Sequence, residues 1–296
     1  MSGITRRELL GAALPAAVAA AGLSELHGST TKAANPKNGG PKVGLVTYLL
    51  AAEWDVPTII ENCTEAKFEA VELRTTHAHG VELALNKAQR KQIRTMFEAS
   101  PVRLASLGSA FEYDSPDPAV LKQNIEGTKE FAQLAADMGC DGIKVRPNRL
   151  HEDKGVQREK TIAQIARGLT EVGNAAAEVG VEIRVEVHGR DTSRFPVYHP
   201  IMEQCESKNV YTNWNCNNND LLDGGLEHNF KLVADSIHFV HMRDLFWETY
   251  PWRKFLGLLN EIGYNGYCCA EIPASSDPLR VMKYYRAMFL ALQDKV

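Results

Sequence analysis

The amino-acid sequence predicts an α/β fold, a single-domain (β/α)8 TIM barrel, and two observations support that prediction. From Lys42 onward, short runs of β-branched and apolar residues alternate with longer segments whose apolar residues recur every three or four positions. Eight such runs fit into the roughly 255 residues up to Val296, which is the usual size and strand count of this barrel. The predicted strands are residues 43–47, 70–73, 103–107, 142–145, 182–187, 210–214, 237–241 and 267–270.

Longer segments between these strands have helical character. Residues 118–138 and 157–178 are the clearest predicted helices, because their apolar residues follow the helical period. Gly139, Gly180 and Gly263 each fall between a helix end and the next strand, where a reversal of the chain favours glycine. An open doubly wound sheet is the alternative, but it favours a glycine-rich phosphate loop after the first strand, and residues 47–53 contain no glycine.

The first 41 residues are predicted to lie outside the barrel, whose domain is residues 42–296. Arg6 and Arg7 precede an Ala-rich stretch that is too short to span a membrane, an arrangement typical of a twin-arginine export signal. We assign residues 1–26 to this signal and residues 27–41, rich in polar residues and glycine, to a solvated linker. An N-terminal amphipathic helix is the alternative. The mature protein is expected in the periplasm, delivered by the export machinery and without stable insertion into the membrane.

Composition and charge limit the classes of partner. The chain has 33 Lys and Arg against 37 Asp and Glu, so it lacks the chain-wide positive charge that nucleic-acid binding favours. An apolar content of 44% excludes a disordered chain. The six cysteines show no CxxC spacing, so we interpret most of them as small buried apolar residues rather than disulfides. The expected partner is a small molecule, and a homo-oligomer is possible.

Four consecutive predicted strands end on groups that could bind a metal ion. In a TIM barrel the catalytic residues lie at the C-terminal ends of the strands. The last four strands place Glu186, Asn215, His241 and Glu271 there. Two carboxylates, an amide oxygen and an imidazole suit one divalent cation, namely manganese, magnesium or cobalt, with zinc also possible. Each residue alone could serve in an ion pair or a turn, but their joint placement favours a metal site.

The strand-end motifs resemble those of the xylose isomerase-like barrel superfamily of sugar isomerases and epimerases, and the resemblance spans residues 42–296. The matching stretches are residues 68–74, 186–188, 238–244 and 263–266, the last leading to Glu271. The resemblance implies that Glu186, Asn215, His241 and Glu271 hold the metal ion. Strand six departs from the pattern, because Asn215 stands where Asp is usual and Asn218 where a substrate-binding His is common.

A metal ion flanked by two glutamates favours the removal and return of a proton next to a carbonyl group, through an enediolate. Glu186 and Glu271 are predicted to transfer the proton, and Lys144 to stabilise the negative oxygen. The side chains predicted to bind the substrate are His188, Arg243, Asn218, Glu72, His77 and Arg146. The sequence therefore predicts a metal-dependent sugar isomerase or epimerase, with manganese the preferred ion and a carbohydrate as substrate.

Three other functions stay open. The same intermediate could eliminate a leaving group, which would give a lyase or dehydratase acting on a keto-sugar or a 3-keto-glycoside. The substitution at Asn215 would also be compatible with a barrel that binds sugar without catalysis. A nuclease similar to endonuclease IV is disfavoured, because the chain offers few further metal-binding histidines and its acidic balance repels DNA.

Overall fold

The eight strands of the chain form one closed parallel barrel in the computed structural model, which describes residues 39–296. Each strand pairs with the next, and β8 pairs with β1 to close the ring. The strands are β1 (Lys42–Val46), β2 (Ala70–Arg74), β3 (Arg103–Glu112), β4 (Gly142–Arg146), β5 (Glu182–Glu186), β6 (Val210–Asn215), β7 (Ile237–Met242) and β8 (Tyr267–Ala270). The predicted barrel is confirmed and the open sheet is wrong. The predicted signal segment and most of the linker lie outside the described residues.

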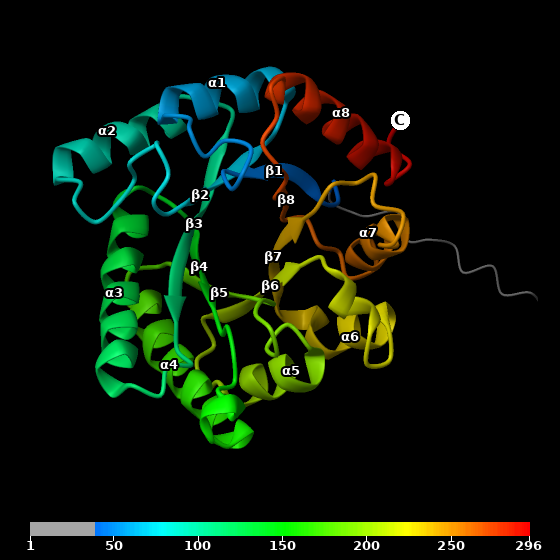
Figure 1. The fold of residues 1–296 in the computed structure, drawn as a ribbon. Coiled ribbons are helices and arrows are strands. Elements are labelled where there is room, and N and C mark those ends of the chain that lie inside the picture. The colour runs from blue at the N-terminus through cyan, green and yellow to red at the C-terminus, as the bar shows by residue number, and fades with distance from the viewer. Residues whose placement is uncertain (1–38) are drawn as a thin grey trace, which may run out of the picture. The chain divides into compact units, whose positions relative to one another are not determined.

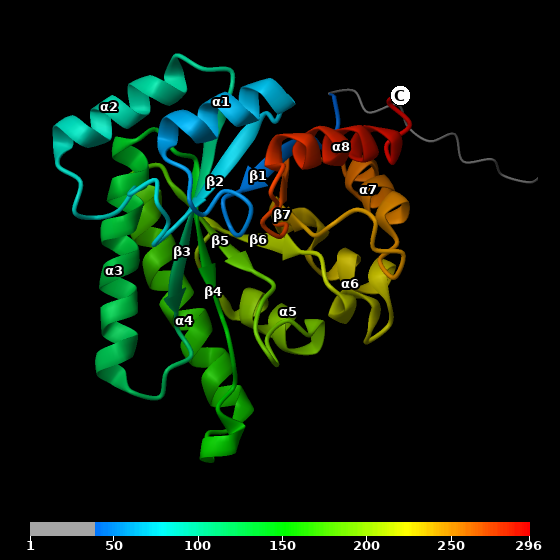
Figure 2. The ribbon, with the colours of Figure 1, turned by 45° about the horizontal axis from the view of Figure 1, so that its top comes forward.

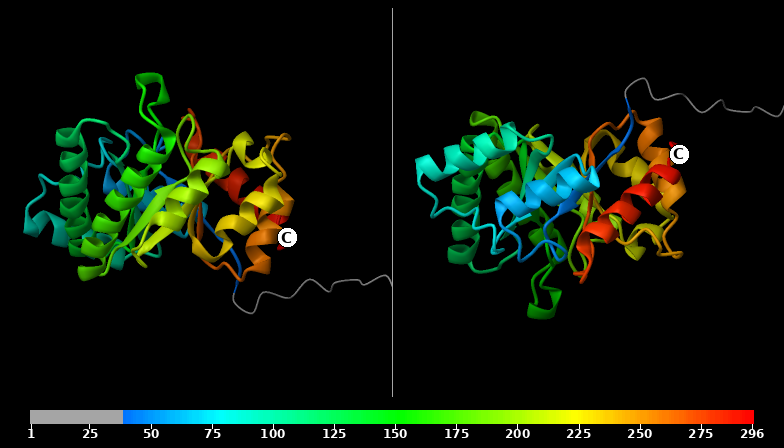
Figure 3. Two further views of the ribbon diagram at one scale, coloured as in Figure 1. Left: turned by 90° about the horizontal axis from the view of Figure 1, so that it is seen from below. Right: turned by 90° about the horizontal axis from the view of Figure 1, so that it is seen from above.

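Eight α-helices surround the described barrel (Figure 1). They are α1 (Val56–Ala66), α2 (Lys87–Glu98), α3 (Pro118–Asp137), α4 (Arg158–Glu178), α5 (Phe195–Gln204), α6 (Leu226–Val233), α7 (Trp252–Glu261) and α8 (Pro278–Ala291). The side chains of Asp55, Asp117 and Asp277 cap α1, α3 and α8, and each of these helices has proline in its first turn. The first and last helices lie side by side (Figures 2 and 3), where Lys283 forms an ion pair with Glu65 at 2.6 Å.

Short helical turns occupy three of the connections. They are η1 (Glu152–Lys154), η2 (Asn218–Leu221) and η3 (Ala234–Ser236). The segment that contains η1, between β4 and α4, projects from the barrel in Figure 3. His151 at its start is buried, because its left-handed backbone (φ 60°) turns the ring to Asp114, with Nε2 2.7 Å from Oδ2.

Strand alternation separates two sets of side chains. Residues such as Val71, Ile143, Val185 and Val240 are buried among the apolar residues that pack the strands against the helices. The alternate positions point into the barrel, and its interior contains a small apolar cluster and a set of buried polar groups. The buried polar groups on the strands include Glu72, Ser106, Lys144, Arg184, Glu186, Asn213, Asn215 and His241. This alternation carries polar side chains to the ends of the strands.

All six cysteines are unpaired thiols in the described part of the chain, and five of them are buried. Cys205 is half-buried. The interpretation of most cysteines as small buried apolar residues is therefore confirmed. Across residues 39–296, no helix combines the length and the apolar character that crossing a membrane requires.

Candidate active site

Three of the four predicted metal ligands meet at one centre. Glu186 is the last residue of β5, His241 lies near the end of β7, and Glu271 directly follows β8. One donor atom from each lies within 4.8 Å of the donor atoms of the other two. Because parallel strands end at the same rim of the barrel, alternation places these three side chains together even though 85 residues separate the first from the last.

Asn215 lies beside this centre and carries an amide group. It is paired with His241 across β6 and β7, and its Nδ2 donates a hydrogen bond to Glu186 Oε1 at 2.9 Å. Among residues 39–296, its buried Oδ1 has no hydrogen-bond partner, and the same is true of His241 Nδ1. A buried polar atom without a partner costs about 1–3 kcal/mol. A divalent cation would satisfy both atoms, so the residues present fit a metal ion.

A further carboxylate, that of Glu72, lies beside the Nε2 atom of His241. Its Nε2 lies 3.2 Å from Glu72 Oε1, whereas its Nδ1 faces Glu186 Oε1 at 3.5 Å. A hydrogen on Nε2 shared with Glu72 would leave the Nδ1 lone pair free for a cation, the usual arrangement of a metal-binding histidine. The sequence predicted Glu72 to bind substrate. The structure instead buries it completely in the barrel beside His241, where it can orient the imidazole.

The two glutamates of the centre have different environments. Burial raises the pKa of Glu186, but the Lys144 ammonium and His241 outweigh it and hold the pKa well below its usual value. Burial raises the pKa of Glu271, and the nearby charges of His241 and Arg243 do not cancel that effect. Two carboxyl groups whose pKa values are pushed apart are typical of an acid and base pair.

Each glutamate also has a basic neighbour. Lys144, buried in the middle of β4, places Nζ 3.1 Å from Glu186 Oε2. Arg243 Nη1 lies 2.5 Å from Glu271 Oε2. Burial alone would lower the pKa of His241, but Glu72 and Glu186 raise it to about 10 in the metal-free chain. A cation bound here therefore competes with a proton on His241, which is expected to weaken metal binding at low pH.

Some of the predicted substrate-binding residues line the pocket at the strand ends, and the others do not. Arg243 and Asn218 line a pocket of about 350 Å³ together with Glu271. His188 is half-buried, and burial lowers its pKa more than Glu186 raises it. Arg146 binds Glu112 at 2.6 Å, and His77 Nδ1 lies 2.9 Å from Thr47 Oγ1. Both of these side chains therefore have partners within the protein.

Sequence reasoning missed Asn213. This residue is fully buried, and its Nδ2 lies 3.1 Å from His241 Nε2. It stands two positions before Asn215 on β6, so strand alternation was the signal that could have found it.

A buried network holds the loop after β6. Asp220 Oδ2 accepts hydrogen bonds from Tyr250 Oη at 2.7 Å and from the backbone N–H of Asn217 at 3.0 Å. Trp214 Nε1 donates to the same Tyr250 hydroxyl at 3.1 Å. These bonds fix the loop that carries Asn217 and Asn218 to the pocket. Burial raises the pKa of Asp220 to about 7.

Asp220 is expected to make stability depend on pH. Because the folded chain holds this proton more tightly than the unfolded chain, stability is highest below the ordinary carboxyl pKa and is lost as the pH rises through about 7. The loss is on the order of 4 kcal/mol of unfolding free energy. Asp220→Asn should flatten the curve over this range, as measured by urea unfolding at several pH values. Asp235→Asn, on an exposed carboxylate, serves as the control, and an unchanged slope in Asp220→Asn would contradict the prediction.

Asn215→Asp is expected to tighten metal binding by about tenfold, since a carboxylate is a stronger ligand than an amide. The same change removes the hydrogen bond to Glu186 and places two carboxylates together, so the metal-free variant should melt at a lower temperature. Competition with a chromophoric chelator and thermal unfolding measure the two effects. Weaker metal binding by the variant would show that residue 215 does not contact the ion.

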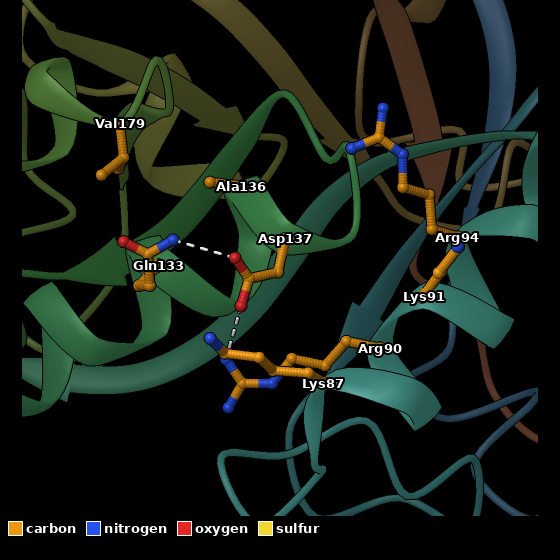
Figure 4. A pocket seen from close by; sticks show the side chains of 8 residues that line it. All are labelled: Lys87, Arg90, Lys91, Arg94, Gln133, Ala136, Asp137 and Val179. Atoms are coloured by element: carbon orange, nitrogen blue, oxygen red, sulfur yellow. Dashed lines mark hydrogen bonds and ion pairs between the residues drawn. The ribbon is translucent and has the colours of Figure 1, made fainter.

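A separate hollow of about 540 Å³ lies on the outside of the barrel between α2 and α3 (Figure 4). Basic side chains of α2 line it, and Arg90 is already bound to Asp137 at 2.8 Å. The hollow lies away from the strand ends, so we assign it no part in the chemistry.

Solved structures of known proteins share this fold. The 3-keto-D-glucoside 4-epimerase of E. coli is 13% identical with a TM-score of 0.71, over 86% of this chain and 99% of that chain. The D-psicose 3-epimerase of Clostridium cellulolyticum H10, solved with D-tagatose, is 14% identical with a TM-score of 0.72, over 85% and 99%. The IolI protein with a bound zinc atom is 14% identical with a TM-score of 0.72, over 86% and 98%.

The sequence itself matches a family. No curated protein sequence matches the chain significantly. The family model of the xylose isomerase-like TIM barrel matches residues 60–291, which is most of the chain. The fold, the strand-end residues and this match agree, and the chain belongs to the xylose isomerase-like TIM barrel family.

Proposed function

We propose that the chain is a divalent-metal-dependent sugar epimerase or isomerase that transfers a proton next to a carbonyl group. The observation that carries the proposal is the shared centre of Glu186, His241 and Glu271 with the unpartnered oxygen of Asn215. The solved structures of similar fold support the class, because two are named as sugar epimerases and a third holds zinc.

The ion would be held by Glu186, Asn215, His241 and Glu271. When bound, it would stabilise negative charge on the substrate carbonyl oxygen. Manganese is the ion we expect, with magnesium, cobalt and zinc as alternatives for this mixture of oxygen and nitrogen donors.

The protein's own groups account for the proton transfer. Glu186, whose pKa is low, is ionised and can accept the substrate proton, and Glu271, whose pKa is raised, can hold a proton and return it. Return to the opposite face of the same carbon gives epimerisation, whereas transfer to the neighbouring carbon gives isomerisation. Lys144 adds positive charge beside Glu186, and Arg243 is placed to bind substrate oxygens.

A lyase or dehydratase is the second candidate. After the proton leaves, the electron pair could expel a group from the next carbon with cleavage of a C–O bond. The pocket favours this alternative, because Tyr48 and Trp247 line it together with Glu271 and its volume of about 350 Å³ leaves room for a leaving group. The proposed export signal fits either candidate, with a neutral sugar or glycoside as the substrate outside the cytoplasm.

The test combines metal analysis with isotope exchange. The purified chain is analysed for bound metal and then incubated with Mn²⁺ in deuterium oxide with a panel of ketoses and keto-glycosides. We expect near-stoichiometric metal, a melting temperature that rises by several degrees with Mn²⁺, and loss of a substrate C–H signal by NMR. A chain that binds no ion and catalyses no exchange would contradict the proposal. Sugar binding without exchange would favour the non-catalytic barrel.

A further inference from the structure

The pocket at the mouth of the barrel has a polar part and an apolar part. The polar residues that line it are Asn217, Asn218, Arg243, Asp244 and Glu271. The apolar part, which we call the apolar wall, consists of Tyr48, Leu49, Trp247, Ile272 and Pro273. The proposed proton-transfer residue Glu271 belongs to the same pocket as this wall, so a sugar bound at the centre has apolar surface within reach on its outer side.

Large apolar side chains of the wall stand open to solvent. Tyr48 is 37% exposed, Leu49 is 43% exposed and Trp247 is 38% exposed. A single exposed apolar side chain is ordinary on a protein surface. Here, however, two separate loops bring three of them to one concave pocket beside the candidate active site, which is a pattern typical of ligand binding.

Contacts within the protein hold the wall in place. Tyr48 stacks on His77, with ring centroids 6.2 Å apart and 14° between the planes. The backbone N–H of Leu49 donates to Ile272 O at 3.1 Å, which joins the loops after β1 and β8. Trp252 Nε1 donates to the backbone oxygen of Trp247 at 3.1 Å. A surface that is already ordered loses little conformational entropy when a ligand covers it.

We propose that the apolar wall binds the second ring of a glycoside, so the substrate class is a keto-glycoside rather than a free monosaccharide. The inference rests on the proposed function, because it takes the reacting sugar to lie at the centre formed by Glu186, His241 and Glu271. A pyranose ring and an aromatic aglycone both present a flat apolar face that stacks on indole and phenol rings. The polar residues of the pocket would then bind the hydroxyl groups of the glycoside.

Calorimetric titration of the full purified chain with Mn²⁺ tests the inference with three unreactive probes. Methyl β-glucoside has no second ring, cellobiose has a second sugar ring, and phenyl β-glucoside has an aromatic aglycone. We expect cellobiose, phenyl glucoside or both to bind about five- to tenfold more tightly than methyl glucoside. The better of the two identifies the kind of ring. Equal affinity for all three probes, or no binding of any, overturns the inference.

Variants locate the binding to the wall. Trp247→Ala should weaken binding of the two-ring probes more than binding of methyl glucoside, and so remove the advantage of the second ring. Phe246→Ala is the matched control, because Phe246 is the neighbouring residue, is 68% exposed and does not line this pocket. Tyr48→Ala, in a different loop, gives the same test should Trp247→Ala fail to fold. Equal effects of Trp247→Ala and Phe246→Ala, or a retained advantage in the two wall variants, count against the subsite.

The outcome can be separated from that of the proposed function. Tighter binding of the two-ring probes without any deuterium exchange would support the subsite and contradict the proposed enzymatic function. Deuterium exchange together with equal affinity for methyl glucoside, cellobiose and phenyl glucoside would support the enzyme and contradict the subsite.

Discussion

Glu271→Gln is expected to lower the rate of substrate C–H exchange by about a thousandfold, since a positioned general acid or base contributes roughly 10²–10⁴ to the rate. The amide keeps the size of the side chain beside Arg243, whose Nη1 lies 2.5 Å from Glu271 Oε2. It cannot accept and release a proton. Exchange of the substrate C–H with deuterium oxide, followed by NMR, measures the loss directly.

Two measurements keep this result interpretable. Bound metal is determined in the same preparation, because Glu271 is also a candidate ligand and loss of the ion would itself abolish exchange. Glu248→Gln, which changes an exposed carboxylate in the loop after β7, should exchange at the wild-type rate. A metal-loaded Glu271→Gln that keeps the wild-type rate would remove Glu271 from the proton transfer.

Glu72→Gln is expected to weaken metal binding by about 10–100-fold, the usual effect of removing the group that orients a metal-binding histidine. Glu72 lies 3.2 Å from His241 Nε2 and is fully buried, so it acts through the imidazole without touching the ion. The neutral amide holds the Nε2 hydrogen less firmly and lowers the basicity of Nδ1. Chelator competition with Mn²⁺ gives the affinity independently of any catalytic rate.

A carboxylate at the opposite end of the barrel provides the matched control. Glu182 Oε1 lies 3.0 Å from His238 Nδ1, so Glu182→Gln alters a comparable carboxylate–histidine pair at the start of β5, away from the metal centre. It should leave the Mn²⁺ affinity unchanged. Equal affinities of the two variants would mean that Glu72 serves only the stability of the fold.

Strand alternation explains why much of the barrel could be predicted from the sequence. Each predicted strand coincides with an observed strand to within one residue at either end, except that β3 extends to Glu112 instead of ending at residue 107. The convergence of Glu186, His241 and Glu271 also followed from the sequence, because the ends of parallel strands in a closed barrel meet at one rim. Local patterns were sufficient for these features.

Contacts across the barrel could not be predicted in the same way. Glu72 on β2 meets His241 on β7, although neither strand pairs with the other, and no periodicity in the sequence relates them. The contact of His151 with Asp114 likewise depends on the path of the loop after β4. Such pairs arise from tertiary packing, which propensity and spacing do not encode.

The rate at which the buried thiols react with a reagent reports on unfolding of the barrel. Cys63, Cys140, Cys216, Cys268 and Cys269 are inaccessible, and Cys205 is half-buried, so an alkylating reagent should modify Cys205 first. The other five can react only when the barrel opens, and their rate of modification then reports the population of open molecules. Mass spectrometry of alkylated chains, with and without Mn²⁺, would show how strongly an ion bound at one rim of the barrel slows the opening that exposes these thiols.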